Sequence, residues 1–374
     1  MTIYLDCNAT TPMDADVAKL VQYYLREEFG NSGSRTHEYG LKAKSAVEKA
    51  RLQVADVVGA QKDEVVFTSG ATESNNIAIL GLAEFLKSEG KNHIITTAIE
   101  HKAVLEPCAF LDSQGFSVTY LQPDAKGGVS VDQVFNAITD KTGLISMMHV
   151  NNETGVILPI DEIANNLLGT EIYFHVDAAQ GFGKLLKPLK NERIDLISIS
   201  AHKVHGPKGV GALITRRKKY KKPPLKPLMY GGGQEKGLRP GTLPVALIAG
   251  LGLASELAER NHESWLNHCE NIRAEAVSAF ESLGGKVNGK NALPNVLNIS
   301  IPDISSEAAI VVLKELVAIS NGSACTSSSY TPSHVLEAMG LDEAEIRQAI
   351  RISWCHKTGT IPWSKIVKRL QSLL

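Results

Sequence analysis

The stretch LISISAHKVHGPKGVGALIT, residues 196–215, joins two apolar runs through a polar turn. The runs LISIS (196–200) and GALIT (211–215) have the length and composition of buried β-strands. Between them, Lys203 is flanked by histidines and followed by a series of glycines. An ammonium group is costly to bury, so a lysine at the mouth of a buried strand indicates a chemical role.

Similar apolar runs precede this stretch, and helical patterns lie between most of them. The other expected strands are 65–69, 93–97, 117–121, 144–150 and 172–177. The helical patterns are 14–29, 42–58, 75–86 and 131–138, with caps expected at Gly30 and Gly59. Strands that alternate with helices favour a mainly parallel sheet covered on both faces. Such α/β sheets bind ligands outside the carboxyl ends of their strands.

The pattern changes after residue 215. The basic run RRKKYKK (216–222) is expected to be a solvated loop, with contact to an acidic partner as the alternative. A run of helices then leads to a strand at 296–300, a helix at 306–316 and an irregular stretch at 320–331. We predict two domains: a large one over residues 13–256, and a small α+β one over residues 1–12 and 257–374.

The composition is that of a globular protein, with 43% hydrophobic and 21% charged residues and a formal net charge of -1. This balance does not indicate nucleic-acid binding or a membrane surface, and no apolar run is long enough to span a bilayer. The five cysteines form no C-x-x-C pair, which argues against disulfides and structural zinc. Since the N-terminus does not resemble a signal peptide, we expect a cytoplasmic protein.

Polar groups follow several of the expected strands. Gly70 and Thr72 begin a helix after the strand 65–69, where free N–H groups would attract an anion. Plain N-capping by Ser69 or Thr72 is the simpler explanation of this corner. Asp177 ends one strand, and His101 follows another. A carboxylate at such a position either caps a helix or holds a cationic ring nitrogen.

Lys203 connects these groups through one cofactor. A lysine in a dry site has a nucleophilic amine, which Schiff-base chemistry requires. Pyridoxal phosphate offers an aldehyde for Lys203, a phosphate for the anion corner and a ring nitrogen for Asp177. Ser200 and His202 are candidates to help hold the phosphate. We expect no metal, because His202 and His205 form a weak pair with no third ligand nearby.

The motifs that carry these residues resemble, in order, those of cysteine desulfurases, which supply sulfur for iron–sulfur clusters and related products. They are LDCNATTP (5–12), GATESNN (70–76), EHKAV (100–104), HVNNETG (149–155), HVDAAQ (175–180), SAHKVHGPKG (200–209), RPGTLP (239–244) and GSACTSSS (322–329). The resemblance implies the aspartate-aminotransferase fold, fold type I, with a mainly parallel seven-stranded sheet. It also implies pyridoxal 5′-phosphate, L-cysteine as substrate and a homodimer.

The resemblance gives each matching residue a role. Lys203 would carry the cofactor and take the substrate's Cα proton, Asp177 would pair with the ring nitrogen, and His101 would stack on the ring. Cys325 would accept the sulfur as a persulfide, from a mobile loop. The remaining contacts implied are Ala71, Thr72, Asn152, Gln180, Ser200 and His202 for the cofactor, Thr242 from a second subunit, and Asn8, Asn152 and Arg351 for the substrate.

One departure and several alternatives stay open. Trp354-Cys355-His356 stands where the family has a small apolar residue, a glycine and a basic residue, so the substrate range or the sulfur acceptor can differ. Cys355 is also the one competitor of Cys325 as nucleophile. A selenocysteine lyase, an aminotransferase and a non-catalytic scaffold are the alternative functions. The acceptor is an iron–sulfur scaffold, a tRNA-modifying enzyme or a protein of a DNA-sulfur pathway, with no direct nucleic-acid binding.

Overall fold

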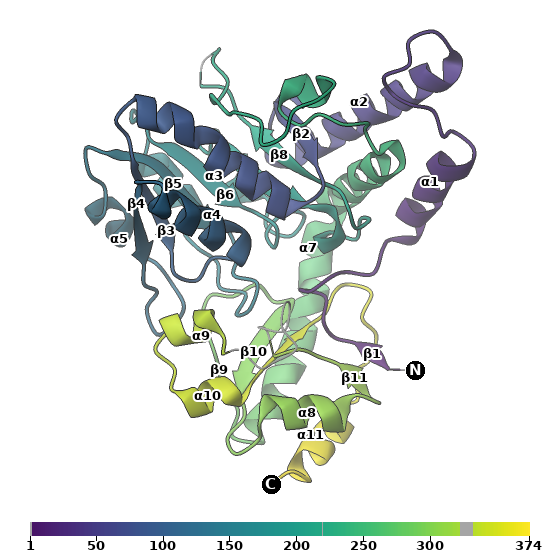
Figure 1. Ribbon diagram of the computed structural model, residues 1–374. Coiled ribbons are helices and arrows are strands. Elements are labelled where there is room, and N and C mark those ends of the chain that lie inside the picture. Colours follow the sequence, from purple (N-terminus) through teal and green to yellow (C-terminus); the bar gives the residue numbers. More distant parts are fainter. Residues whose placement is uncertain (1, 219, 322–331) are drawn as a thin grey trace.

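The computed structural model describes residues 2–218, 220–321 and 332–374, so the predicted nucleophile Cys325 lies outside the described residues. Its central feature is a seven-stranded sheet in the order β2-β8-β7-β6-β5-β3-β4 (Figure 1). Only β8 runs antiparallel to its neighbours in this sheet, which confirms the predicted fold class. The strands are β2 (Val65–Thr68), β3 (His93–Thr97), β4 (Ser117–Leu121), β5 (Thr142–Met148), β6 (Tyr173–Asp177), β7 (Leu196–Ser200) and β8 (Gly211–Thr215).

Both faces of the sheet are covered by helices. Successive residues of a strand point to opposite faces. Leu196 packs in the core with α3 (Ala71–Ser88) and α4 (Lys102–Ser113). Ile197 packs in the core with α2 (Glu38–Val58) and the start of α7 (Val245–Glu281). Because both faces are buried, the strands are rich in apolar residues, and polar side chains within them, such as Ser198 and His175, are buried and hydrogen-bonded to each other. The helices of this part are α1 (Ala15–Arg26), α2 (Glu38–Val58), α3 (Ala71–Ser88), α4 (Lys102–Ser113), α5 (Val131–Asn136) and α6 (Ile160–Asn166).

The two predicted glycine caps have different outcomes. Gly59 ends α2 in the left-handed conformation, with φ 66°, as predicted. The prediction for Gly30 is wrong, because α1 ends at Arg26 and its cap is Glu27. A Cβ atom on Gly30 would lie 2.3 Å from the backbone oxygen of Tyr39. The glycine at position 30 therefore permits a close approach between two chain segments.

A single helix, α7 (Val245–Glu281), replaces the predicted run of helices. Its first half packs in the core beside α1 and α2, and its second half packs in a separate core with β10 and β12. The predicted domain boundary at residues 256/257 falls inside this helix and stays a prediction. The second core is built from β1 (Ile3–Tyr4), β10 (Val296–Ser300), α8 (Ser306–Leu313), β11 (Val317–Ala318), β12 (Ala349–Ser353) and α11 (Trp363–Gln371).

The basic run does not lie wholly in solvent, as we had predicted. Arg216 is buried, and its guanidinium donates to the backbone oxygens of Asn191, Ile194, Val58 and Leu189. An arginine can take this place because its planar fork of N–H donors satisfies several carbonyls at once. Arg217 and Tyr220 are exposed, so the prediction holds for these two residues.

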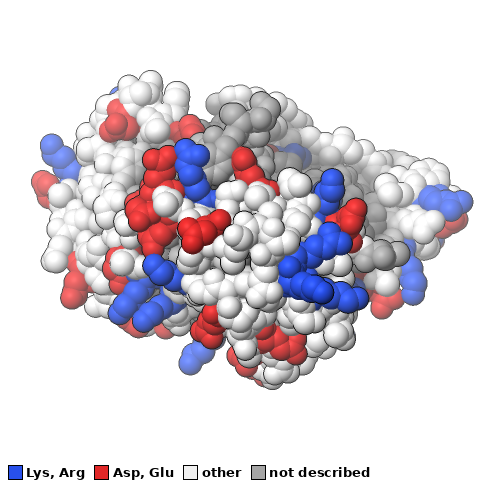
Figure 2. Space-filling view, turned by 90° about the horizontal axis from the view of Figure 1, so that it is seen from below, with Lys and Arg blue, Asp and Glu red and all other residues white. Residues whose placement is uncertain are grey.

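The surface carries both signs of charge. On the face seen in Figure 2, basic and acidic side chains are interspersed, and neither sign covers the face. This mixture agrees with the formal net charge of -1. Among the described residues, no helix combines the length and the apolar character needed to cross a membrane.

Candidate active site

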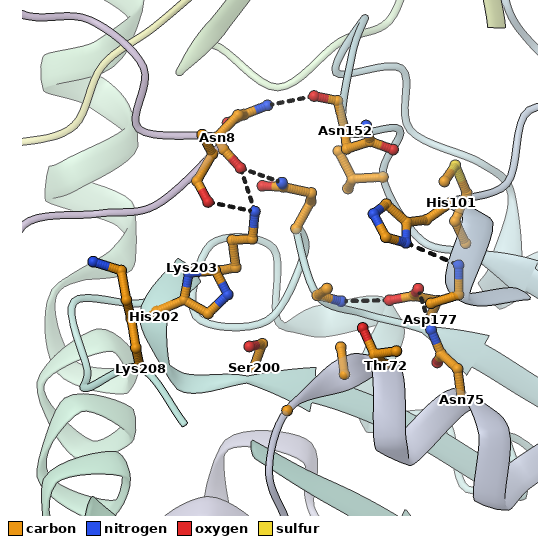
Figure 3. A pocket seen from close by; sticks show the side chains of 18 of the residues that line it. Asn8, Thr72, Asn75, His101, Asn152, Asp177, Ser200, His202, Lys203 and Lys208 are labelled. Atoms are coloured by element: carbon orange, nitrogen blue, oxygen red, sulfur yellow. Dashed lines mark hydrogen bonds between the residues drawn. The ribbon is translucent and has the colours of Figure 1, made fainter. Parts of the chain in front are cut away.

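A cavity of about 520 Å³ opens at the carboxyl ends of the central strands (Figure 3). Thr242 is exposed and does not line it, and its predicted role in a second subunit stays a prediction. Lys208 and Asn75, to which we had assigned no role, also line the cavity. The predicted site residues that do line it are Asn8, Ala71, Thr72, His101, Asn152, Asp177, Gln180, Ser200, His202, Lys203 and Arg351.

Lys203 is brought to the cavity by the short turn that follows β7. Its Nζ donates to the backbone oxygens of Asn8 at 2.5 Å and Ala9 at 2.9 Å. The glycines that follow Lys203 have different surroundings. A Cβ on Gly211 would lie 2.3 Å from the oxygen of Ile199, so this glycine serves backbone packing, whereas Gly209 lines the cavity.

Asp177, the last residue of β6, presents a buried carboxylate with two hydrogen bonds. Its Oδ2 accepts from Asn75 Nδ2 at 2.7 Å, and its Oδ1 accepts from the backbone N–H of Ala179 at 2.9 Å. These contacts orient the carboxylate towards the cavity without neutralising it. Asn75 lies on α3, 102 residues before Asp177 in the chain, so its contact with Asp177 could not be predicted from the sequence.

The anion corner lies at the start of α3. Gly70 is the N-cap, and no side chain caps this end of the helix. The simpler explanation, capping by Ser69 or Thr72, is therefore wrong. The first N–H groups of a helix have no acceptor within it, and here they meet the cavity lined by Ala71, Thr72 and Ser200. The corner can therefore bind an anionic group.

His101 stands between the end of β3 and the start of α4. Its Nδ1 accepts from the backbone N–H of Ala103 at 3.1 Å, so the ring also caps α4. Burial lowers the pKa of His101, despite the opposing effect of the Asp177 carboxylate. A neutral ring with Nδ1 as acceptor carries its proton on Nε2. His101 can then stack on a planar ligand and offer one N–H.

Arg351, on β12, is almost fully buried at the edge of the cavity. Its guanidinium donates to Asp6 Oδ1 at 2.8 Å and to the backbone oxygen of Asn152 at 3.2 Å. Its Nε is buried without a partner. We had not predicted Asp6, although it stands in the quoted motif LDCNATTP. A guanidinium held in this way can bind a substrate carboxylate through its remaining donors.

Asp6→Asn is expected to raise the KM for L-cysteine, the substrate that the resemblance implies, by about tenfold or more, the equivalent of one charge-assisted hydrogen bond. The guanidinium of Arg351 would lose the carboxylate that orients it. The control is Asp14→Asn, which breaks the 2.6 Å ion pair with Lys357 outside the cavity. Steady-state kinetics of both variants test this, and an unchanged or lower KM for Asp6→Asn would contradict the role.

The segment Trp354-Cys355-His356 lies outside the lining of this cavity. Trp354 is fully buried and its Nε1 donates to the backbone oxygen of Cys269 at 3.2 Å. Cys355 is buried as well and lines a separate, smaller cavity. The departure from the family pattern therefore does not reshape the wall of the large cavity directly.

The family model for aminotransferase class V matches residues 3–360 of the chain. The cysteine desulfurase IscS of Buchnera aphidicola subsp. Baizongia pistaciae is 46% identical over 94% of this chain and 87% of its own length. This chain belongs to the cysteine desulfurases of aminotransferase class V. The predicted family and function are thereby confirmed: the protein is an enzyme that removes sulfur from cysteine.

Solved structures of this family share the fold of the desulfurase described here. DndA from Streptomyces lividans is 49% identical, with a TM-score of 0.83 over 94% of this chain and 99% of that one. SspA, solved in complex with cysteine, is 43% identical, with a TM-score of 0.82 over 94% and 98% of the two chains. Each of the two matches covers nearly the whole of both chains.

Proposed function

We propose that the desulfurase uses pyridoxal 5′-phosphate, bound in the large cavity and bonded to Lys203. The proposal is carried by one observation: an amine, an oriented carboxylate and an uncapped helix N-terminus meet at a single cavity. These groups match the aldehyde, the ring nitrogen and the phosphate of this cofactor. Membership of aminotransferase class V supports the same choice.

The chemistry of the lining fits the cofactor. The uncapped start of α3 and the hydroxyls of Thr72 and Ser200 supply donors for a phosphate. Asp177, held by Asn75, supplies the charge that keeps a ring nitrogen protonated. A volume of about 520 Å³ leaves room for a small amino acid beside the cofactor.

Residues of the chain have separate roles in the proposed reaction. When bound, the cofactor supplies an electron sink for the substrate's Cα. Lys203 Nζ takes the proton from that carbon, and His101 covers the ring and offers its Nε2 proton. Arg351 holds the substrate carboxylate, while Asn8, Asn152 and Gln180 contact the remaining polar groups.

Cys325 is the proposed acceptor of the sulfur. Its thiolate attacks the substrate's sulfur, so that an S–S bond forms while the Cβ–S bond breaks. The electron pair of the broken bond stays with the carbon, which is protonated and leaves as L-alanine. The persulfide on Cys325 is then passed to an acceptor protein.

The cellular setting belongs to the same proposal. We propose a cytoplasmic homodimer in which Thr242 of each subunit contacts the phosphate in the other. The acceptor is an iron–sulfur scaffold, a tRNA-modifying enzyme or a protein of a DNA-sulfur pathway. Equimolar release of alanine and sulfide from L-cysteine separates this function from an aminotransferase, and comparison with L-selenocysteine separates it from a selenocysteine lyase.

Borohydride reduction of the purified enzyme is expected to fix the cofactor to one peptide, the one that contains Lys203. Lys208→Ala is the matched control, because this lysine lines the same cavity and should not be required for the label. Peptide mapping by mass spectrometry measures the result. A label on Lys208, or on no lysine, would contradict the assignment.

A further inference from the structure

A second, smaller cavity of about 30 Å³ lies beside the cofactor site and has a different chemical character. Cysteine and histidine side chains from four separate parts of the chain line it, namely Cys7, His205, His262, Cys269, Cys355 and His356. None of these six residues lines the large cavity. The desulfuration chemistry described above uses none of them.

Three of these residues present metal-ligating atoms to one point. One ligand atom each from His205, Cys355 and His356 lies within 4.8 Å of the other two. Donors around a tetrahedral zinc ion stand roughly 3.3–3.8 Å apart, given its bond lengths to nitrogen and sulfur. The distances between the three ligand atoms therefore need to shorten by only about 1 Å for the atoms to bind one zinc ion.

The surroundings hold the donors in place. His205 donates from Nδ1 to the backbone oxygen of Pro12 at 2.9 Å, which leaves Nε2 as the ligating nitrogen. A hydrogen bond from the other ring nitrogen to a backbone carbonyl is typical of metal-bound histidines. The ring of His356 stacks on Trp265, with centroids 3.9 Å apart and 7° between the planes. Both imidazoles are thus oriented before any ion binds.

Cys7, in the N-terminal segment, is the candidate for a fourth ligand. Cys7 and Cys355 are both buried and line the same small cavity. Cys7 is not among the residues whose ligand atoms lie within 4.8 Å of one another, so its sulfur would have to move closer to the other three to complete the site. Two thiolates and two neutral imidazoles around a divalent zinc ion give a site with no net charge. A neutral site suits this cavity, because the amine of Lys184 also lines it.

We propose that His205, Cys355 and His356, with Cys7 as fourth ligand, bind one zinc ion that ties together the N-terminal segment, the loop after Lys203 and the segment after β12. From the sequence we had expected no third ligand near the pair His202 and His205; the fold brings Cys355 and His356 beside His205, while His202 is not part of this group. Cys7 precedes Asn8, whose backbone oxygen accepts from Lys203. The ion would therefore fix the segment that contacts the catalytic lysine.

The test is metal binding by the holoenzyme, after treatment with a chelator and a reductant and in the absence of cysteine. Zn²⁺ is expected to bind at one ion per chain, measured by elemental analysis after dialysis. Co²⁺ is expected to give the visible d–d bands of tetrahedral thiolate coordination, at longer wavelength than the cofactor absorbs. Zn²⁺ should also raise the midpoint of thermal unfolding by a few degrees.

Cys355→Ser and His356→Asn are expected to weaken binding about a hundredfold or more, since loss of even an outer-shell partner costs 10–100-fold. His356 is only partly buried, so its variant keeps the test valid if Cys355→Ser does not fold. Cys108→Ala and Cys325→Ser are the controls and should still bind one ion. Equal binding by all variants, binding lost only with Cys325, or no bound ion in the wild type would overturn the proposal.

Discussion

Cys325→Ser is expected to release no sulfide from L-cysteine, although the variant still binds the cofactor and the substrate. The hydroxyl of serine is a far weaker nucleophile than a thiolate towards sulfur and cannot form a persulfide. The residue needed must meet both the substrate and an outside acceptor. Cys7, Cys108, Cys269 and Cys355 are all buried, which counts against each of them in this role.

The measurement is sulfide and alanine release, together with the absorbance of the cofactor before and after L-cysteine is added. Limiting iodoacetamide should also label Cys325 ahead of the four buried cysteines, because alkylation requires an accessible thiolate. Cys355→Ser is the informative comparison and is expected to retain sulfide release. Loss of release in Cys355→Ser, with release retained in Cys325→Ser, would show that the nucleophile has been misassigned.

Asp177→Asn is expected to keep the cofactor bound and to lower kcat by about a hundredfold or more, the usual cost of one electrostatic partner. A neutral amide does not hold the proton on the ring nitrogen, so the cofactor accepts electrons less readily. The amide oxygen of the variant can still accept from Asn75. Its NH2 group then faces the backbone N–H of Ala179, which in the wild type donates to Asp177 at 2.9 Å, so that hydrogen bond is lost.

Asp195→Asn is the matched control for this variant. Asp195 is also buried in the sheet region and accepts from the backbone N–H of Phe174 at 2.7 Å, but it does not line the cavity. Its loss is expected to lower the melting midpoint while turnover per bound cofactor stays near the wild-type value. If Asp177→Asn turns over at the wild-type rate with an unchanged cofactor spectrum, Asp177 is not the partner of the ring nitrogen.

The strands and the cofactor residues could be predicted because their signals are local. LISIS and GALIT match β7 and β8, since a short and mostly apolar run is typical of a strand buried on both faces. Lys203, Asp177 and His101 each follow or end such a strand, and parallel strands bring their carboxyl ends to one edge of the sheet. Short motifs at the ends of strands were therefore sufficient to predict that these three residues lie at one cavity.

The contacts that a local pattern does not encode came from the tertiary structure alone. Asp6 with Arg351, Asn75 with Asp177, and His205 with Cys355 and His356 are all pairs far apart in sequence. Nothing in the periodicity of a helix or strand says which distant polar group will satisfy a buried charge or donor. That choice depends on how the two cores pack around α7, and packing sums weak contacts over the whole chain.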